Sequence, residues 1–186
     1  MSSDICRETG AYLRNNLQGH FFDIQLANAM SKILKEYEIT SVYDFGCGHG
    51  EYTRHLRQDG FDCSGFDANP YTEEITKEGC TVLNLSESID LDPVDCVLCL
   101  EMGEHIPRKF EEIVIENIHK SSSNLVVLSW AIEGQDGEGH VNCRNNDYIK
   151  KIFQDLGYDN LVGEEAILRN SSSLPWFRNT IMVFKK

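Results

Sequence analysis

The feature that most constrains this chain is a short apolar run that ends in an acid and three alternating glycines. The run is Val42-Tyr43-Asp44-Phe45, and Gly46-Cys47-Gly48-His49-Gly50 follows it directly. Apolar and aromatic residues favour a buried strand, whereas glycine permits positive φ and leaves space for a ligand against the backbone. A predicted helix over residues 51–58 would aim its free N–H groups at the same space. The stretch therefore predicts a strand, a glycine turn and a helix that bind a nucleotide-like ligand.

The spacing of these residues is D-x-G-x-G-x-G, which distinguishes between two kinds of nucleotide site. A dinucleotide turn needs G-x-G-x-x-G, and its third glycine would fall where this chain has Glu51. The spacing instead resembles motif I of the class I S-adenosyl-L-methionine (SAM) dependent methyltransferases, in particular the small single-domain members of type 11 or 12. A second acid, Asp67, ends the next expected strand seventeen residues after Gly50, where the family has a carboxylate that binds the ribose.

The resemblance implies an α/β fold: a Rossmann-like, doubly wound, seven-stranded sheet, mostly parallel with a C-terminal antiparallel strand, and helices on both faces. Alternating short apolar and amphipathic runs favour the same βαβ repetition. The expected strands cover residues 41–45, 62–67, 80–85, 94–100 and 125–130, with a final pair at 165–168 and 180–184. The expected helices cover residues 24–36, 51–58, 72–78, 109–120 and 147–156.

We expect residues 1–186 to form one domain, because the length suits a single core and no linker or repeat is visible. Within it, residues 1–38 would form an N-terminal helical segment and residues 39–186 the Rossmann-like core. The resemblance implies that the aromatic stretch 11–22 is a lid over the cofactor. The same aromatics could instead only dock the following helix onto the sheet.

Charge restricts the partners that the chain can bind. There are 30 acids and 17 bases, a formal net charge of −13, and no cluster of five or more basic residues. Nucleic-acid phosphates and acidic membrane surfaces would be repelled, so we expect neither as a partner. A neutral or cationic small molecule fits better. The sequence also has no apolar run long enough to span a bilayer and no signal-peptide core, which predicts a cytoplasmic protein.

The seven cysteines predict free thiols, because an odd number scattered over strands and turns is not a disulfide framework. Cys96 and Cys99 form a C-x-x-C pattern, but on a strand their side chains would point to opposite faces. With no second pair to complete a zinc site, we expect no bound metal.

Several cofactor contacts are implied by the resemblance. Asp44 would lie near the methionine amino group of SAM, Asp67 would bind the ribose, and Ala68 and Asn69 would flank the adenine. Many relatives have an aspartate after the third strand; this chain has Asn84, whose amide could contact the adenine or simply end the strand. The full expected set for SAM and its product S-adenosyl-L-homocysteine is Asp44, Phe45, Gly46, Cys47, Gly48, Gly50, Tyr52, Asp67, Ala68, Asn69, Asn84, Leu85 and Leu100.

Acceptor contacts are expected after the fourth and fifth strands, because ligands lie beyond the carboxyl ends of a doubly wound sheet. Residues 101–107, Glu-Met-Gly-Glu-His-Ile-Pro, resemble a segment of many small-molecule methyltransferases. Its acid and histidine could accept a proton from the acceptor or could only brace the loop. The expected catalytic residues are His105, Glu104 and His140. The expected substrate contacts are Tyr12, Glu101, Trp130, His140, Asn142 and Arg144.

The leading functional prediction is a SAM-dependent methyltransferase (EC 2.1.1.-) that methylates an N, O or S atom of a small molecule, as a monomer or a homodimer. The alternative is a non-catalytic SAM-binding subunit that activates or stabilises a partner protein. The intact glycine motif opposes that alternative, because such subunits often lose their cofactor site. Aminopropyl transfer and nicotinamide-dependent hydride transfer are weaker interpretations, and Glu51 argues against the second.

Overall fold

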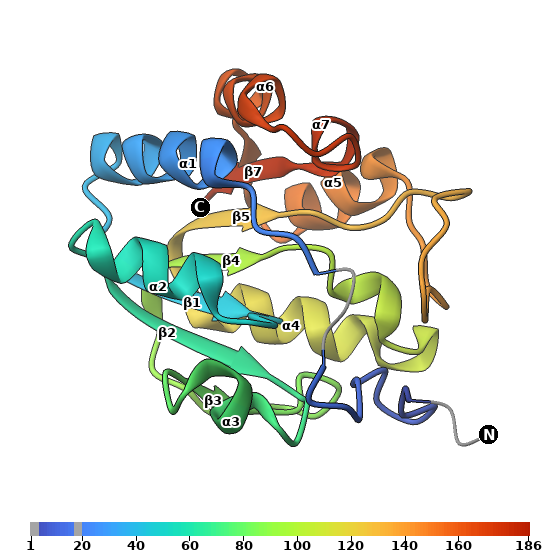
Figure 1. Ribbon diagram of the computed structural model, residues 1–186. Helices are drawn as coiled ribbons and strands as arrows, with labels where there is room; N and C mark the ends of the chain where they lie inside the picture. The colour runs from blue at the N-terminus through green and yellow to red at the C-terminus, as the bar shows by residue number, and fades with distance from the viewer. Residues whose placement is uncertain (1–3, 17–19) are drawn as a thin grey trace.

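The computed structural model describes residues 4–16 and 20–186, and these form a seven-stranded sheet in the order β3-β2-β1-β4-β5-β7-β6 (Figure 1). The strands are β1 Ser41–Phe45, β2 Asp62–Asp67, β3 Cys80–Val82, β4 Val94–Cys99, β5 Ser122–Leu128, β6 Asp159–Asn160 and β7 Met182–Lys185.

The direction of the strands matches the predicted fold class. Strands β1 to β5 pair in parallel, whereas β7 lies antiparallel between β5 and β6. The chain order reverses between β1 and β4, and this is the point where doubly wound sheets bind ligands beyond their carboxyl ends. The prediction of a mostly parallel sheet with an antiparallel C-terminal strand is confirmed.

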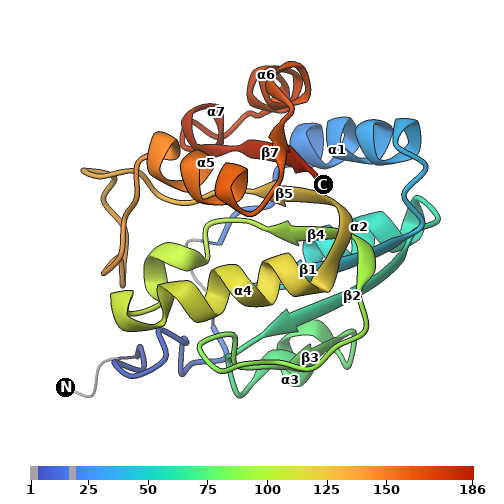
Figure 2. The same ribbon diagram turned by 180° about the vertical axis from the view of Figure 1, so that it is seen from behind.

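Helices cover both faces of the sheet (Figures 1 and 2). One face packs against α1 Ile24–Glu36, α2 Glu51–Gln58, α6 Val162–Ser171 and α7 Phe177–Thr180. The other packs against α4 Glu111–Ser121 and α5 Asn146–Asp155. The short helix α3 Thr72–Thr76 lies beside β3, and the 3-10 turns η1 Gly103–His105 and η2 Arg108–Phe110 connect β4 to α4.

The two cysteines of the C-x-x-C pattern lie on opposite faces of the sheet. Cys96 is buried in the core on the α1 side and Cys99 in the core on the α4 side. Both thiols are free. The prediction that they point to opposite faces of a strand is confirmed.

The predicted strand at residues 165–168 is wrong, because this stretch lies inside helix α6. Glu165 and Leu168 are buried, while Ile167 is 52% exposed. Burial three residues apart is the spacing of a helix, whereas a strand would bury alternate residues. The true partner of β7 is the two-residue strand β6, and Thr180, predicted to start the last strand, ends α7 instead.

Other expected boundaries shift by a few residues. Helix α3 stops at Thr76 rather than residue 78, because Lys77 and Glu78 have left-handed φ values of 57° and 62°. Strand β3 ends at Val82 rather than residue 85, and β5 begins at Ser122 and ends at Leu128.

Helix α1 is fixed at its start by a buried acid. Oδ1 of Asp23 accepts hydrogen bonds from the N–H groups of Gln25 and Leu26, both at 3.1 Å. Oδ2 accepts from the Ser172 hydroxyl and the Ser173 N–H, both at 2.7 Å. A single carboxylate therefore caps α1 and holds the end of α6 against it.

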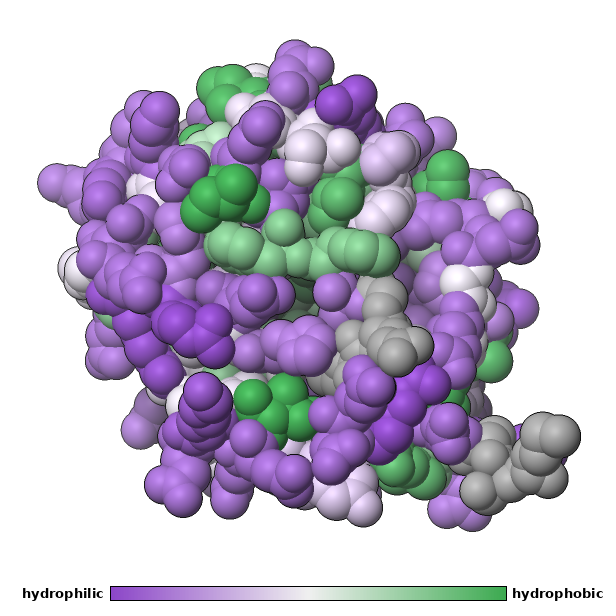
Figure 3. All heavy atoms as spheres, viewed as in Figure 1, coloured by the Kyte–Doolittle hydropathy of each residue, from purple (hydrophilic) through white to green (hydrophobic). Residues whose placement is uncertain are grey.

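Hydrophilic residues cover most of the face seen in Figure 3. No helix in the described part of the chain is long and apolar enough to cross a membrane.

Candidate functional site

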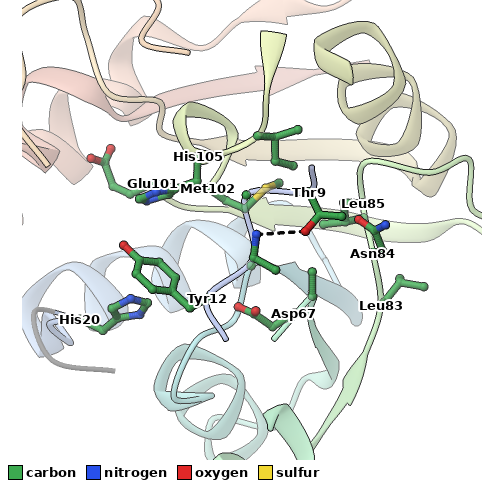
Figure 4. A pocket seen from close by; sticks show the side chains of 15 residues that line it. Thr9, Tyr12, His20, Asp67, Leu83, Asn84, Leu85, Glu101, Met102 and His105 are labelled. Carbon is green, nitrogen blue, oxygen red and sulfur yellow. Dashed lines mark hydrogen bonds between the residues drawn. The ribbon is translucent and has the colours of Figure 1, made fainter. Parts of the chain in front are cut away.

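Two cavities open where β1, β2 and β4 end, as the sheet topology requires. The larger holds about 440 Å³ and the smaller about 70 Å³. Both are lined by Tyr12, His20, Gly46, Glu101 and His105, so the two cavities lie side by side with a shared wall, and we refer to the pair as the cleft. In the smaller cavity, Tyr12 and His20 lie near Glu101 and His105, opposite Leu83, Asn84 and Leu85 (Figure 4).

The glycine turn forms the floor of the cleft. Gly46, Gly48 and Gly50 have φ values of 78°, 52° and 67°, in the left-handed region that other residues rarely adopt. A Cβ on Gly46 would lie 2.5 Å from the Met102 side chain. The turn thus needs glycine both for its conformation and for the space above it.

Asp67 holds this turn from the end of β2. One carboxylate oxygen accepts the Gly48 N–H at 3.0 Å, and the other accepts the Asn69 N–H at 2.9 Å. Each oxygen has a further lone pair. Asp67 can therefore accept hydrogen bonds from two ligand hydroxyls while it keeps the turn in place.

Asp44 lines the larger cavity from the end of β1 and is 3% exposed. Burial raises its pKa to about 7, although a hydrogen bond from the Thr53 hydroxyl at 2.6 Å acts in the opposite direction. A buried carboxylate of this kind favours a cationic ligand group beside it, because such a group restores the charged form.

Residues at the end of β3 line the smaller cavity together with Ala68. The amide oxygen of Asn84 already accepts two hydrogen bonds from Ser86, from its N–H at 3.0 Å and its hydroxyl at 2.7 Å. The Asn84 amide thus holds the turn that follows β3, and Asn84 also lines the cavity wall.

Residues near the N-terminus cross the cleft. The Tyr12 hydroxyl donates to the Glu138 carbonyl at 2.9 Å, and Arg14 pairs with the Glu138 carboxylate at 2.6 Å. On the other side, the Asn69 amide donates to the Arg14 carbonyl at 2.8 Å. The segment therefore joins the loop after β5 to the end of β2, and it covers the cleft between them. The predicted lid 11–22 includes residues 17–19, which lie outside the described residues.

The loop after β4 brings two acids to the cleft. Glu101 has a left-handed φ of 48°, and its carboxylate accepts hydrogen bonds from Gln135 at 2.7 Å and Thr180 at 3.0 Å. Glu104 is 0% exposed, and burial raises its pKa well above the usual range, with Glu101 adding repulsion. A strained backbone and a buried acid together are typical of a functional site.

Two histidines complete this end of the cleft. His105 and His140 have ring centroids 5.0 Å apart. Burial lowers the pKa of His105 to about 4, and the nearby His140 acts in the same direction. His140 Nε2 lies 3.9 Å from a Glu104 carboxylate oxygen. The three predicted catalytic side chains thus meet at the wall of the larger cavity.

Three predicted substrate contacts lie outside both cavities. Trp130 is fully buried, and its indole N–H donates to the Asn142 carbonyl at 2.7 Å. Arg144 pairs with Glu111 at 2.5 Å, and the buried Asn142 side chain helps to lower the pKa of Glu111. These residues support the loop that carries His140, rather than line the space for a substrate.

The expected cofactor contacts divide in a similar way. Phe45 is fully buried in the core, Gly50 starts α2, and Asn69 supports the N-terminal segment. The cavities are lined by the other members of the set: Asp44, Gly46, Cys47, Gly48, Tyr52, Asp67, Ala68, Asn84, Leu85 and Leu100.

Several lining residues were not predicted individually from the sequence: Thr9, Gly10, Ala11, Leu83, Met102 and Ile106. Of these, Ala11 lies in the predicted lid 11–22, and Met102 and Ile106 lie in the segment 101–107. At Gly10 the structure requires glycine, because a Cβ there would lie 2.2 Å from the His105 carbonyl oxygen. The rest are ordinary side chains brought to the cleft by the path of the backbone.

The sequence matches a family of known proteins. Residues 20–162 match the model of a family described as a methyltransferase domain. No curated protein matches the chain.

Solved structures resemble the fold at low sequence identity. Magnesium protoporphyrin IX methyltransferase from Synechocystis PCC 6803 with bound SAM is 18% identical, with a TM-score of 0.65 over 87% of this chain and 78% of that one. The 1,6-didemethyltoxoflavin-N1-methyltransferase from Burkholderia thailandensis is 13% identical, with a TM-score of 0.60 over 88% and 78%. The small RNA methyltransferase HEN1 is 17% identical, with a TM-score of 0.67 over 92% of this chain and 26% of that one.

Proposed function

The chain belongs to the methyltransferase domain family, and on that premise we propose that it transfers a methyl group from SAM to an N, O or S atom of a small molecule. The observation that carries the proposal is the glycine turn, with Asp44 and Asp67 beside it, at the floor of a cavity of about 440 Å³. That volume is in the range of small-molecule sites.

The residues present fit SAM. The left-handed glycines leave the backbone open to a ligand, and Asp67 keeps lone pairs for ribose hydroxyls. Asp44 is buried at the end of β1 and would pair with the positively charged methionine amino group of SAM. The solved relative from Synechocystis holds SAM, which supports the same cofactor here.

The acceptor is proposed from charge and size. A net charge of −13 opposes a nucleic-acid acceptor and favours a neutral or cationic one. The similar structures are named for a porphyrin, a toxoflavin precursor and small RNA, so the fold is compatible with several acceptor classes.

Bound SAM supplies a methyl group on a sulfonium, which is already a good leaving group. The chain's own task is then to align the acceptor with the methyl carbon and to exclude water. The N-terminal segment, which covers the cleft, would help to exclude water, and the glycine turn held by Asp67 would support the cofactor. Glu104, His105 and His140 line the larger cavity and would face the acceptor, and burial lowers the pKa of His105 to about 4, so its ring is neutral at pH 7.

The test is calorimetric titration of the protein with SAM and with S-adenosyl-L-homocysteine. We expect micromolar binding of both, and a loss of about tenfold or more for Asp67→Ala, because two ribose hydrogen bonds to a charged group disappear. The matched control is Asp62→Ala, at the exposed amino end of the same strand, which should bind as the wild type does. Equal affinity of Asp67→Ala and the wild type would contradict the proposed cofactor site.

Turnover is tested by mass spectrometry of candidate acceptors incubated with SAM. Release of S-adenosyl-L-homocysteine with a mass gain of one methyl group on a small molecule is the expected result. SAM binding without turnover on any acceptor, together with a stable complex in size-exclusion chromatography of cell extract, would instead favour the non-catalytic subunit.

A further inference from the structure

Three potential metal ligands meet at one end of the cleft. Among the described residues, Glu104, His105 and His140 each place one donor atom within 4.8 Å of the other two. One is a carboxylate oxygen and two are imidazole nitrogens. Two histidines and one carboxylate are the ligands of several catalytic metal centres. We refer to these three side chains as the His-Glu cluster.

Glu104 is the member that most needs a partner. It is 0% exposed, and neither carboxylate oxygen has a hydrogen bond from any described residue. The N–H groups of Glu104 itself and of Ala131 lie close enough to affect its pKa, but they do not have hydrogen-bonding geometry. A buried carboxylate without a partner is strongly unfavourable. A cation at this position would remove that cost.

The orientation of His140 directs its Nε2 atom toward Glu104. Its Nδ1 lies 3.0 Å from the Gln135 carbonyl oxygen, which can only accept a hydrogen bond. Nδ1 therefore carries the proton, and in the neutral ring Nε2 has a free lone pair, 3.9 Å from a Glu104 oxygen. A carbonyl that holds the second nitrogen of an imidazole is the usual support for a metal-binding histidine.

The surrounding backbone is shaped to this cluster. A Cβ on Gly137 would lie 2.1 Å from His140 Nε2, and a Cβ on Gly139 would lie 3.2 Å from His105 Nδ1. That His105 nitrogen is buried and has no hydrogen bond of acceptable geometry among the described residues. The loop 134–139 can thus wrap around the two rings only because glycine stands at these positions.

We propose that Glu104, His105 and His140 bind a divalent first-row transition metal ion such as Zn²⁺, Mn²⁺ or Co²⁺. Imidazole ligands favour these ions over Mg²⁺ and Ca²⁺. Ligands about 2.1 Å from a tetrahedral ion lie roughly 3.4 Å apart, so rotations that bring the donors together by about 1 Å complete the site. Since the cluster lines the larger cavity, a fourth position on the ion would face the acceptor. This proposal departs from the expectation of no bound metal that the cysteine pattern supports.

The test measures metal binding alone, without SAM or an acceptor, so its outcome is independent of the proposed function. Chelator-treated protein is titrated with Zn²⁺ and Mn²⁺ by calorimetry, and with Co²⁺ by visible absorption. We expect one ion per chain, a Co²⁺ spectrum typical of low coordination number, and binding about 10-fold to 100-fold weaker in Glu104→Gln and His140→Gln. His119→Gln, in the last turn of α4 and outside the His-Glu cluster, should bind as the wild type does.

A variant that fails to fold is recognised by its circular dichroism spectrum, and the wild-type Co²⁺ spectrum then remains decisive. Absence of saturable binding of all three ions by the wild type would overturn the proposal. So would equal affinity of the folded cluster variants and the wild type, since the ion would then lie elsewhere.

Discussion

Asp44 is a buried acid at the wall of the larger cavity, and its burial destabilises the folded protein at neutral pH. It is 3% exposed, and burial raises its pKa from 3.8 to about 7. The folded protein therefore holds a proton on Asp44 that the unfolded chain releases near pH 4. Between these two values, folding becomes less favourable as the pH rises, and above about pH 7 the full cost of burying the charge is present.

Asp44→Asn should consequently be more stable than the wild type at pH 8. The expected gain in the free energy of unfolding is a few kcal/mol, since about three pKa units correspond to roughly 4 kcal/mol. The gain should shrink as the pH falls toward 4, where both proteins carry a neutral side chain. Urea denaturation at several pH values measures this, and a difference independent of pH would contradict it. The same variant should bind SAM less tightly.

Gly103 shows how closely the loop after β4 is packed. A Cβ at this position would lie 2.4 Å from the ring of the buried Trp130. Gly103→Ala should lower the free energy of unfolding by about 1–3 kcal/mol, because neither backbone nor ring has space to move. Gly163→Ala in helix α6 is the matched control, since a Cβ added there would meet no atom within 4 Å. It should be neutral or slightly stabilising in the same urea denaturation.

At the scale of elements, Asp23 links α1 to the segment after α6. Burial acts to raise its pKa, but hydrogen bonds from Ser172, Leu26, Ser173 and Leu174 outweigh this, and the pKa is lowered. The stabilisation is therefore present above pH 3.8 and is lost as the pH falls below that value.

Asp23→Ala should reduce the free energy of unfolding by about 2–4 kcal/mol, because it removes a helix cap and leaves buried N–H groups without a partner. Asp147→Ala, in the first turn of α5 and exposed, should change it by less than about 1 kcal/mol. Thermal denaturation of both variants at neutral pH compares them. Similar melting temperatures would show that the link contributes little.

Elements with a strong local pattern could be predicted from the sequence, and those that depend on distant partners could not. Strand β1 with its glycine turn has a pattern that no other element shares. The run at 165–168 is too short for its pattern to separate a strand from a helix, and the helix it forms packs against distant elements, α1 and β7. The two-residue strand β6 has no pattern at all, because pairing with β7 alone defines it.

Site residues likewise divide into those with a local sequence pattern and those whose position depends on distant partners. Asp44 and Asp67 could be predicted because each lies at the carboxyl end of a recognisable strand. Trp130 and Arg144 could not be assigned, since an aromatic or a cation after a strand can face either a cavity or the core. In this structure Trp130 bonds to Asn142 and Arg144 to Glu111, so both side chains face the interior rather than a cavity. Those contacts depend on the path of the loop.

For the whole molecule, the net charge of −13 predicts a dependence on ionic strength. A cationic acceptor should be attracted to the cleft at low salt, so its KM should rise several-fold as salt increases from about 0.05 M to 0.5 M. A neutral acceptor provides the control, since its KM should hardly change. Steady-state kinetics at a series of salt concentrations measures both, and a KM of the cationic acceptor that is independent of salt would contradict the proposed attraction.

The shared wall of the two cavities has a thermodynamic consequence. Tyr12, His20, Gly46, Glu101 and His105 each face both spaces. Any shift of these residues that admits a ligand to one cavity also changes the space left for a second ligand, such as the cofactor or the acceptor, in the other cavity. The affinities of the two ligands are then linked, and the factor by which the first changes the second must equal the factor by which the second changes the first.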